Sequence, residues 1–367
     1  MEKIVRPGFE GIASAFGSVA AGRPGWSGAV CVIVEGTTVV DLWTDAADHD
    51  ALYPVHSCTK GVGAGAIALL VSRGLLDPDA PVASYWPEFG AGGKAEVTVG
   101  QLMSHQAGLT SVDGGFDLAA VLEHTDLARK LADQVPYWVP GSRHGYHALT
   151  IGVLMRELVL RTDGRTTKEL YDAEMRMPYD IDFTIGCPVS SRGRIRRFRE
   201  SAVAPPTAEE MEAVASNPLF VPAFGDEPLD LNMPLRAEVM DGDLLAAGGV
   251  ASARGLATYY AALTTGLDGR PPLLDRASID RCSEPRAVGP DAILPVETGF
   301  GLGFMVPCER MPFAGTTSFG HDGAGGALGF ATPALHLAFG WTTDTAHSQG
   351  ADPAALSIAS AIEELLR

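Results

Sequence analysis

The sequence predicts an α+β fold, in which one antiparallel sheet flanked by helices lies beside a mostly helical second region. Helix-like and strand-like segments occur at both ends of the chain, whereas residues 98–215 have mostly helical apolar spacing. A sheet completed by both termini accounts for this order. We therefore expect a sheet domain formed by residues 1–60 and 240–367 and a helical insert domain formed by residues 61–239, with the functional site at their interface.

The N-terminal elements begin with an expected helix at residues 9–22. Residues 28–36 and 37–44 are β-rich and meet at Gly36, which is typical of a hairpin. Residues 60–74 then predict a helix that ends at a glycine. Its expected apolar stripe consists of Val62, Ala66, Leu69 and Leu70.

The later elements are mainly helices and strands separated by one long connection. Residues 149–164 and 166–177 are the clearest helices of the centre. Residues 202–234 are rich in proline and asparagine, so we expect a connection there and not a packed element. A helix at residues 248–266 follows, with Ser252 as its N-cap. Strand-like runs at residues 299–306, 325–333 and 335–343 precede a terminal helix at residues 353–366.

The composition excludes some classes of partner. The 367 residues carry a formal net charge of -18, from 45 acidic against 27 basic residues. A surface this acidic repels phosphate groups, so we expect neither nucleic-acid nor membrane binding. The oligomeric state is left open by the sequence.

Cysteine usage and the N-terminal segment bear on cofactors and compartment. The five cysteines have neither zinc-site nor disulfide-framework spacing, so they indicate no structural metal and no disulfide framework. We also expect no cofactor. His144 and His147 could share a helix face, but they lack an acidic third ligand nearby. The first residues do not have the pattern of a signal peptide, and no segment is apolar enough to span a bilayer. These features predict a cytoplasmic protein.

Reactive side chains occur at three places, although the chain has no G-x-S-x-G, H-E-x-x-H or Walker motif. In HSCTKG, Ser57 and Lys60 are three residues apart at a predicted helix start, so their side chains share one face. The helix N-terminus favours an alkoxide and disfavours a nearby ammonium, and a desolvated Lys60 can act as base toward Ser57. The alternative is a capping serine and a surface lysine.

The other two places are a tyrosine and a glycine-rich segment. Tyr146 lies where an apolar-striped helix is expected to begin, and a neighbouring ammonium would lower the pKa of its phenol. In GHDGAGG, which holds His321 and Gly323, the glycines let the backbone present N–H groups to a substrate. A core tyrosine and a structural histidine are the alternatives.

Five arginines lie between Arg192 and Arg199. A solvated, charged segment is one interpretation, and a site for an anionic substrate or partner is the other.

Together these motifs resemble the class C β-lactamase-like serine hydrolase family, in its S-x-x-K esterase and penicillin-binding-protein-like branch. The family's order of motifs is present, and the flanking segments SCTKGVGAGAIALLVSRGLLDPDAPVASYWPEF, VTVGQLMSHQAGL, PGSRHGYHALTIG and FGHDGAGGALGF are similar to it. The resemblance runs from about residue 25 to the end and implies the β-lactamase/penicillin-binding-protein-like fold.

The resemblance implies a role for each motif. Ser57 would be acylated, with Lys60 and Tyr146 sharing the roles of base and acid. The backbone N–H groups of Ser57 and of Ala324, just beyond Gly323, would hold the oxyanion. His321 occupies the place of a lysine in lactamases and penicillin-binding proteins.

Two departures from the family favour esters over penicillins. Ala148 stands where true β-lactamases have an asparagine that contacts the substrate amide. His321, mostly uncharged at neutral pH, weakens the capture of a substrate carboxylate. We expect a carboxylesterase acting on a small-molecule ester or acyl substrate. The alternatives are a transacylase that uses an amine or alcohol in small-molecule biosynthesis, a weak β-lactamase or D-peptidase, and a retired binding protein.

Overall fold

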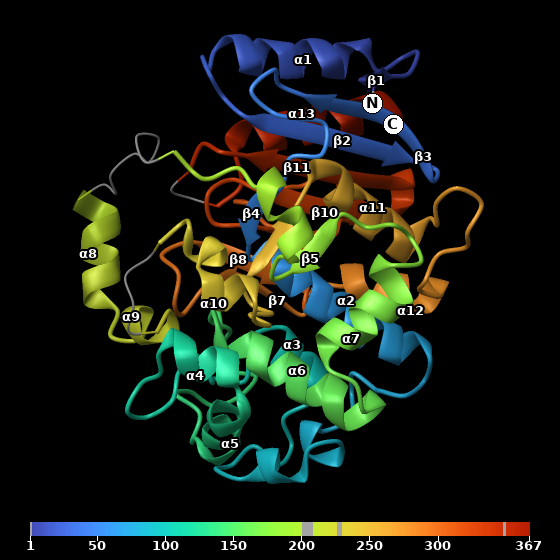
Figure 1. Cartoon of the computed structure of the whole chain (residues 1–367). Coiled ribbons are helices and arrows are strands. Elements are labelled where there is room, and N and C mark those ends of the chain that lie inside the picture. Colours follow the sequence, from blue (N-terminus) through green and yellow to red (C-terminus); the bar gives the residue numbers. More distant parts are fainter. Residues whose placement is uncertain (1, 200–207, 226–229, 348–349) are drawn as a thin grey trace.

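The computed structural model describes residues 2–199, 208–225, 230–347 and 350–367. Its largest sheet has six antiparallel strands in the order β1-β3-β2-β11-β10-β9. They are β1 (Ile4–Val5), β2 (Gly28–Val34), β3 (Thr37–Trp43), β9 (Phe319–Asp322), β10 (Leu328–Thr332) and β11 (Leu337–Thr343). Because β2 pairs with β11, both ends of the chain build this sheet, as the sequence predicts (Figure 1).

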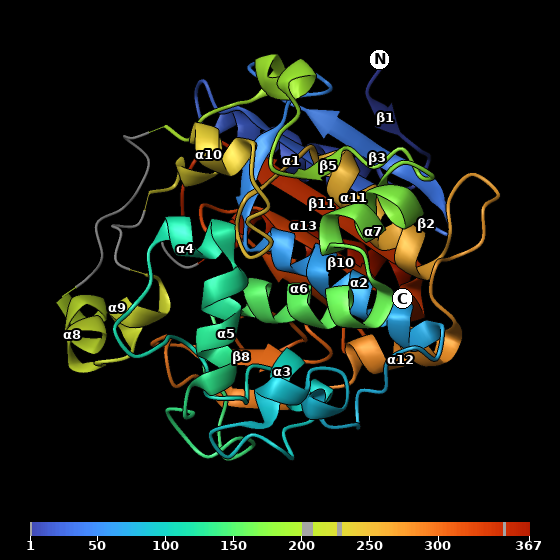
Figure 2. The ribbon, with the colours of Figure 1, turned by 60° about the horizontal axis from the view of Figure 1, so that its bottom comes forward.

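Helices cover both faces of this sheet (Figures 1 and 2). One face carries α1 (Glu10–Ala21) and α13 (Pro353–Leu366), and the other carries α11 (Ala253–Thr264). Gly340 of β11 permits the close approach of α11, since a Cβ there would lie 2.0 Å from the carbonyl oxygen of Ala253. Ser252 caps α11 by accepting a hydrogen bond from Gly255 N at 3.0 Å, which confirms the predicted N-cap.

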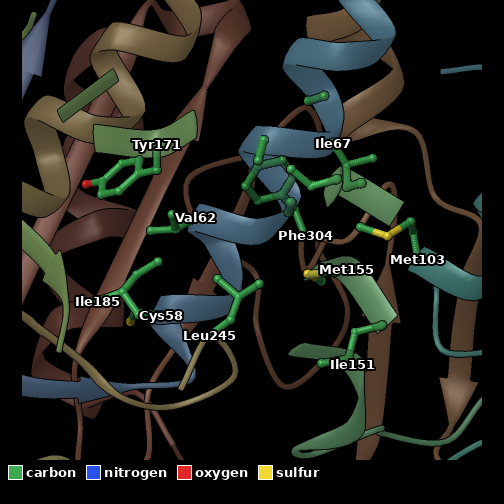
Figure 3. Close-up of a cluster of buried hydrophobic side chains, with 14 of the residues drawn as sticks. Cys58, Val62, Ile67, Met103, Ile151, Met155, Tyr171, Ile185, Leu245 and Phe304 are labelled. Atoms are coloured by element: carbon green, nitrogen blue, oxygen red, sulfur yellow. The ribbon is translucent and has the colours of Figure 1, made fainter. Parts of the chain in front are cut away.

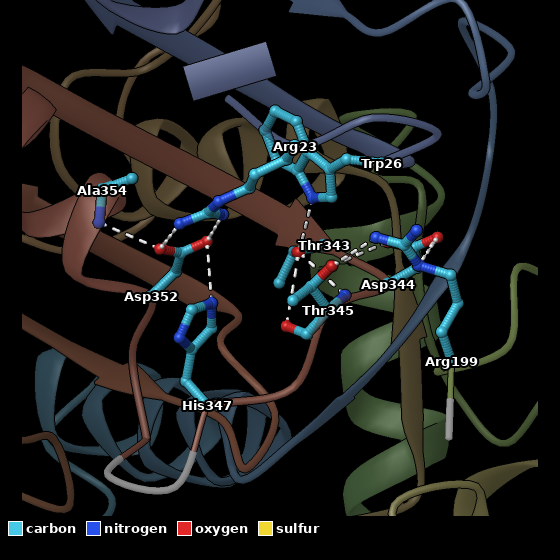
Figure 4. Close-up of polar contacts among 9 residues, drawn as sticks. All are labelled: Arg23, Trp26, Arg199, Thr343, Asp344, Thr345, His347, Asp352 and Ala354. Carbon is cyan, nitrogen blue, oxygen red and sulfur yellow. Dashed lines mark hydrogen bonds and ion pairs between the residues drawn. The ribbon is translucent and has the colours of Figure 1, made fainter. Parts of the chain in front are cut away.

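A buried carboxylate joins the two ends of the chain (Figure 4). Asp352, the N-cap of α13, is fully buried and accepts hydrogen bonds from Arg23 at 2.5 and 2.9 Å. His347 Nε2 lies 3.2 Å from the same carboxylate. Although burial opposes its ionisation, these partners lower the pKa of Asp352 to about 2.

The helix α2 (Cys58–Ser72) follows β4 (Tyr53–His56) and runs through the interior. All but its last two residues are buried. The four residues of the expected apolar stripe are among them, but burial extends around the rest of the helix. Figure 3 shows Val62 pointing toward Tyr171 and Ile67 pointing toward Met103, on different sides of the helix. Glycines make this possible, since a Cβ at Gly65 would lie 2.0 Å from the hydroxyl of Tyr259.

Helices alternate with long loops in the central region. They are α3 (Val99–Met103), α4 (Leu118–Glu123), α5 (Thr125–Asp133), α6 (Thr150–Asp163) and α7 (Thr167–Tyr171), followed by a π-helical turn (Asp172–Arg176) and, later, α12 (Arg276–Ser283). Short 3-10 turns occupy Val82–Ser84, Pro87–Gly90, Val189–Arg194, Met233–Leu235 and Pro333–Leu335. The division into a sheet domain and a helical insert domain stays a prediction.

Two smaller sheets were not expected. β4 and β5 (Phe183–Ile185) both pair with β6 (Gly249–Ala251), and β7 (Ala287–Pro290) pairs with β8 (Glu297–Phe300). The strand expected at residues 299–306 is therefore wrong beyond Phe300, where the chain turns and Gly303 adopts a φ of +81°.

The expected connection at residues 202–234 is wrong in part where the structure describes it. Residues 202–207 and 226–229 lie outside the described part. The rest contains α8 (Ala208–Ser216) and α9 (Phe220–Ala223), before α10 (Ala237–Met240). Ala223 is fully buried against the aromatic core, so α9 is a packed element despite its proline.

The arginine-rich segment is held by aspartates. Arg192 pairs with Asp241, Arg194 with Asp50 and Asp182, Arg196 with Asp48, and Arg199 with Asp344 (Figure 4). Four of its five arginines therefore tie this segment to neighbouring parts of the fold, which favours a charged structural segment over a site for an anionic partner. Among the described residues, no helix has the length and apolar character needed to cross a membrane.

Candidate active site

Ser57 lies between β4 and α2, where two polar side chains meet its hydroxyl. Tyr146 OH donates a hydrogen bond to Ser57 Oγ at 2.8 Å, and Lys60 Nζ donates one at 3.1 Å. Ser57 precedes the first residue of α2, and its Oγ makes no capping hydrogen bond to the helix backbone. The structure thus brings the three predicted residues together.

Lys60 is 1% exposed and lies one helical turn from Ser57. Its Nζ also donates to Ala246 O at 2.8 Å and lies 4.8 Å from the centroid of the Tyr146 ring. Burial lowers the pKa of Lys60 to about 7. A large fraction of Lys60 is therefore neutral near neutral pH and can accept a proton.

Tyr146 differs from its expected properties in two ways. It lies four residues before α6 and not at its first residue. Burial raises the pKa of its phenol, so the expected lowering by a neighbouring ammonium is wrong. Lys60 is also buried, and in its neutral form it has no positive charge that would stabilise a phenolate. Tyr146 is therefore a hydrogen-bond donor at neutral pH.

The two histidines that flank Tyr146 do not share a helix face, because residues 144–147 are not helical. His144 Nε2 lies 3.0 Å from Thr298 Oγ1. His147 Nε2 accepts a hydrogen bond from Leu109 N at 2.9 Å. Within the described ranges there is no group of three or more side chains placed to hold a metal ion.

The end of β9 lies against the nucleophile segment. Cys58 Sγ, next to Ser57, donates to the carbonyl oxygen of His321 at 3.2 Å. A Cβ at Gly323 would lie 2.1 Å from the carbonyl oxygen of Val55, so only glycine fits there. Within the described part of the chain, the backbone N–H groups of Ser57 and Ala324 have no hydrogen-bond acceptor.

His321 is a buried, neutral side chain in this region. Its Nδ1 donates to the carbonyl oxygen of Asp322 at 2.7 Å, which leaves Nε2 as an acceptor. Nε2 is buried without a partner among the described residues, and the ring centroid lies 6.2 Å from that of Tyr146. Burial lowers the pKa of His321. Asp322 is ionised, because its ion pair with Arg310 at 2.9 Å holds its pKa below the ordinary value despite burial.

Comparisons with known proteins identify the family of this chain. A family model described as Beta-lactamase matches residues 12–363. The chain belongs to the β-lactamase family of serine hydrolases. The expected fold is thereby confirmed, over a longer stretch than the motifs alone cover.

Named relatives of this β-lactamase-family chain include esterases. It is 34% identical to Esterase/beta-lactamase LipL of Mycobacterium tuberculosis, over 88% of this chain and 77% of the relative. The solved structure of EstA from Arthrobacter nitroguajacolicus Rue61a is 39% identical, with a TM-score of 0.91, covering 100% of this chain and 99% of that one. A structure described as a family VIII carboxylesterase is 27% identical, with a TM-score of 0.89 and full coverage of both chains.

Two residues of this β-lactamase-family site were missed by the sequence analysis. His56, directly before Ser57, has a φ of +41°, and its Nε2 donates to Leu231 O at 2.8 Å. Burial lowers the pKa of His56 to about 4, so it is neutral. Asp291 Oδ1 accepts a hydrogen bond from Tyr146 N at 3.0 Å. The step PD indicates a turn at Asp291, but no sequence signal connects that turn with Tyr146.

Proposed function

We propose that this protein is a carboxylesterase that works through an acyl-enzyme on Ser57. The observation that carries this proposal is the convergence of Lys60 Nζ and Tyr146 OH on Ser57 Oγ. A nucleophile that contacts both a buried amine and a phenol has a proton acceptor and a proton donor within reach of one oxygen.

The first half of the reaction transfers the acyl group to Ser57. Neutral Lys60 accepts the hydroxyl proton as Oγ attacks the ester carbonyl. The oxyanion accepts hydrogen bonds from the N–H groups of Ser57 and Ala324. The bond to the alcohol then breaks, Tyr146 gives its proton to the departing oxygen, and Tyr146 is reprotonated from Lys60.

The second half returns the enzyme to its starting state. Water attacks the acyl carbonyl and passes one proton, through Tyr146, to Lys60. The tetrahedral intermediate collapses, the carboxylic acid leaves and Ser57 recovers its proton. An amine or alcohol that replaced water at this step would make the same protein a transacylase, so the products formed with added acceptors distinguish the two activities.

Two side chains support esters over β-lactams as substrates. Ala148 is 3% exposed and offers no amide to a lactam substrate. His321 is neutral and buried, so it supplies no positive charge for a substrate carboxylate. The site therefore suits an uncharged small-molecule ester.

The direct test compares p-nitrophenyl butyrate with a chromogenic cephalosporin. We expect rapid ester turnover that Ser57→Ala abolishes, with little cephalosporin hydrolysis. One relative is named both esterase and beta-lactamase, so both substrates are compared. Faster hydrolysis of the cephalosporin than of the ester would overturn the ester assignment. Products formed with added amines or alcohols are analysed in the same experiment.

A further inference from the structure

The loop after α3 holds a histidine that the proposed reaction does not use. His105 is fully buried, and its φ of +61° is uncommon for a residue with a side chain. Burial holds the pKa of His105 well below its ordinary value, and the neighbouring His147 and Lys60 act in the same direction. A buried, neutral histidine in such a backbone conformation requires a reason, and its hydrogen bonds indicate one.

His105 binds the chain on both sides of Tyr146. Gly145 N donates to the carbonyl oxygen of His105 at 3.1 Å, and His147 N donates to His105 Nδ1 at 3.1 Å. Between them, Tyr146 N donates to Asp291 Oδ1 at 3.0 Å. Three successive N–H groups are thereby fixed, two of them by the same histidine.

The ring of His105 also lies close to the rings of Tyr146 and Phe300. Its centroid lies 5.2 Å from that of Tyr146 and 4.3 Å from that of Phe300. Phe300 in turn stacks on Tyr146 at 6.1 Å with an interplanar angle of 14°. Because Nδ1 is an acceptor, the proton of the neutral ring is on Nε2, and the ring orientation is set by the bond to His147 N.

We propose that His105 is a positioning residue, which holds the Tyr146 hydroxyl in line with Ser57 Oγ. The inference rests on the proposed function, since it assigns His105 an effect only through Tyr146. A displacement of about 1 Å at a reacting group lowers turnover about 100-fold. His105 is thus needed for the rate of acyl transfer and not for substrate binding.

The test uses two substitutions that tolerate a positive φ. His105→Gly removes the Nδ1 acceptor without adding backbone strain. His105→Asn keeps a side-chain acceptor for His147 N. His124→Gly is the matched control, because His124 is a histidine with a φ of +59° at a helix junction between α4 and α5.

We expect His105→Gly to lower kcat for p-nitrophenyl butyrate about 100-fold with little change in KM. We expect His105→Asn to recover most of that loss and His124→Gly to keep the original kcat. Thermal unfolding of each variant establishes that it folds. If the glycine variant does not fold, the asparagine variant decides, and a 100-fold loss of kcat in it would overturn the inference.

A double-mutant cycle with Tyr146→Phe separates positioning from general destabilisation. If His105 acts through the phenol, His105→Gly costs almost nothing further once the hydroxyl is gone. Losses that multiply in the double mutant would overturn the inference and leave the proposed function intact. Full activity of Tyr146→Phe alone would overturn the role proposed for the phenol itself.

Discussion

The hydroxyl of Tyr146 donates a hydrogen bond of 2.8 Å to Ser57 Oγ, across 89 residues of sequence. Separate contacts hold the two residues of this hydrogen bond. Ser57 is anchored through Cys58 to the end of β9, and Tyr146 through its N–H to Asp291. Because Lys60 contacts the same oxygen from within α2, small shifts of either segment change the distance between the proton partners.

The pH dependence of turnover follows from Lys60. Its pKa of about 7 belongs to the group that must be neutral to accept the Ser57 proton. We expect kcat/KM to rise about tenfold per pH unit below pH 7 and to level off above it. Lys60→Ala abolishes turnover, whereas replacement of the half-exposed Lys130 leaves the profile unchanged. A kcat/KM that is flat between pH 5.5 and 8.5, or an active Lys60→Ala, is incompatible with this role.

The backbone at Gly323 is a second point at which the site can be tested. In Gly323→Ala, the new Cβ would meet Val55 O at 2.1 Å and displace the segment that carries Ala324 N–H. We expect kcat for p-nitrophenyl butyrate to fall about 100-fold, as for loss of one oxyanion donor. Gly17→Ala in α1 is the control, since nothing lies within 4 Å of its added Cβ. Equal kcat in the two variants would remove this segment from the oxyanion site.

We expect the charge at position 321 to control the substrate class. His321→Lys introduces an ammonium beside Asp322, which can bind a substrate carboxylate. We expect the ratio of cephalosporin to butyrate kcat/KM to rise about tenfold. His336→Lys, on the exposed turn before β11, serves as control and leaves the ratio unchanged. An unchanged ratio in His321→Lys argues that this residue does not select against lactams.

The carboxylate of Asp352 provides a test of stability that does not depend on catalysis. Its pKa of about 2 lies below the ordinary value, so its stabilising effect is present above about pH 4 and is lost as the pH falls toward 2. Asp352→Asn should lower the free energy of unfolding at pH 7 by about 2 kcal/mol. Urea unfolding measures this, with the exposed Asp126→Asn as a control that changes little. The same stability loss in both variants would contradict the account of the buried pair.

Local sequence signals predict much of the fold. The β2–β3 hairpin, the Ser252 cap and helices α1 and α13 depend on residues close together in the chain, and all four are present. The burial of α2 beyond its expected stripe was not predicted, because it depends on glycines that let neighbours approach the helix from several sides. The strand β5 is three residues long, too short to give a periodic pattern.

The residues of the site also differ in how far local sequence predicts them. Ser57, Lys60 and Tyr146 occur in recognisable motifs, so the sequence predicts them. His105 and Asp291 act through contacts to the backbone around Tyr146, which depend on segments that meet only in the folded chain. Burial raises the pKa of Tyr146. The sequence motif does not reveal how deeply the phenol is buried.

The central claim is that Ser57 carries the acyl group. The most direct measurement is intact-mass analysis after rapid mixing with p-nitrophenyl butyrate and acid quenching, followed by peptide mapping. We expect a butyryl adduct on the peptide containing Ser57 in the unmodified protein, and none in Ser57→Ala. Turnover of the ester by Ser57→Ala at the original rate, or a butyryl group mapped to another side chain, would contradict it.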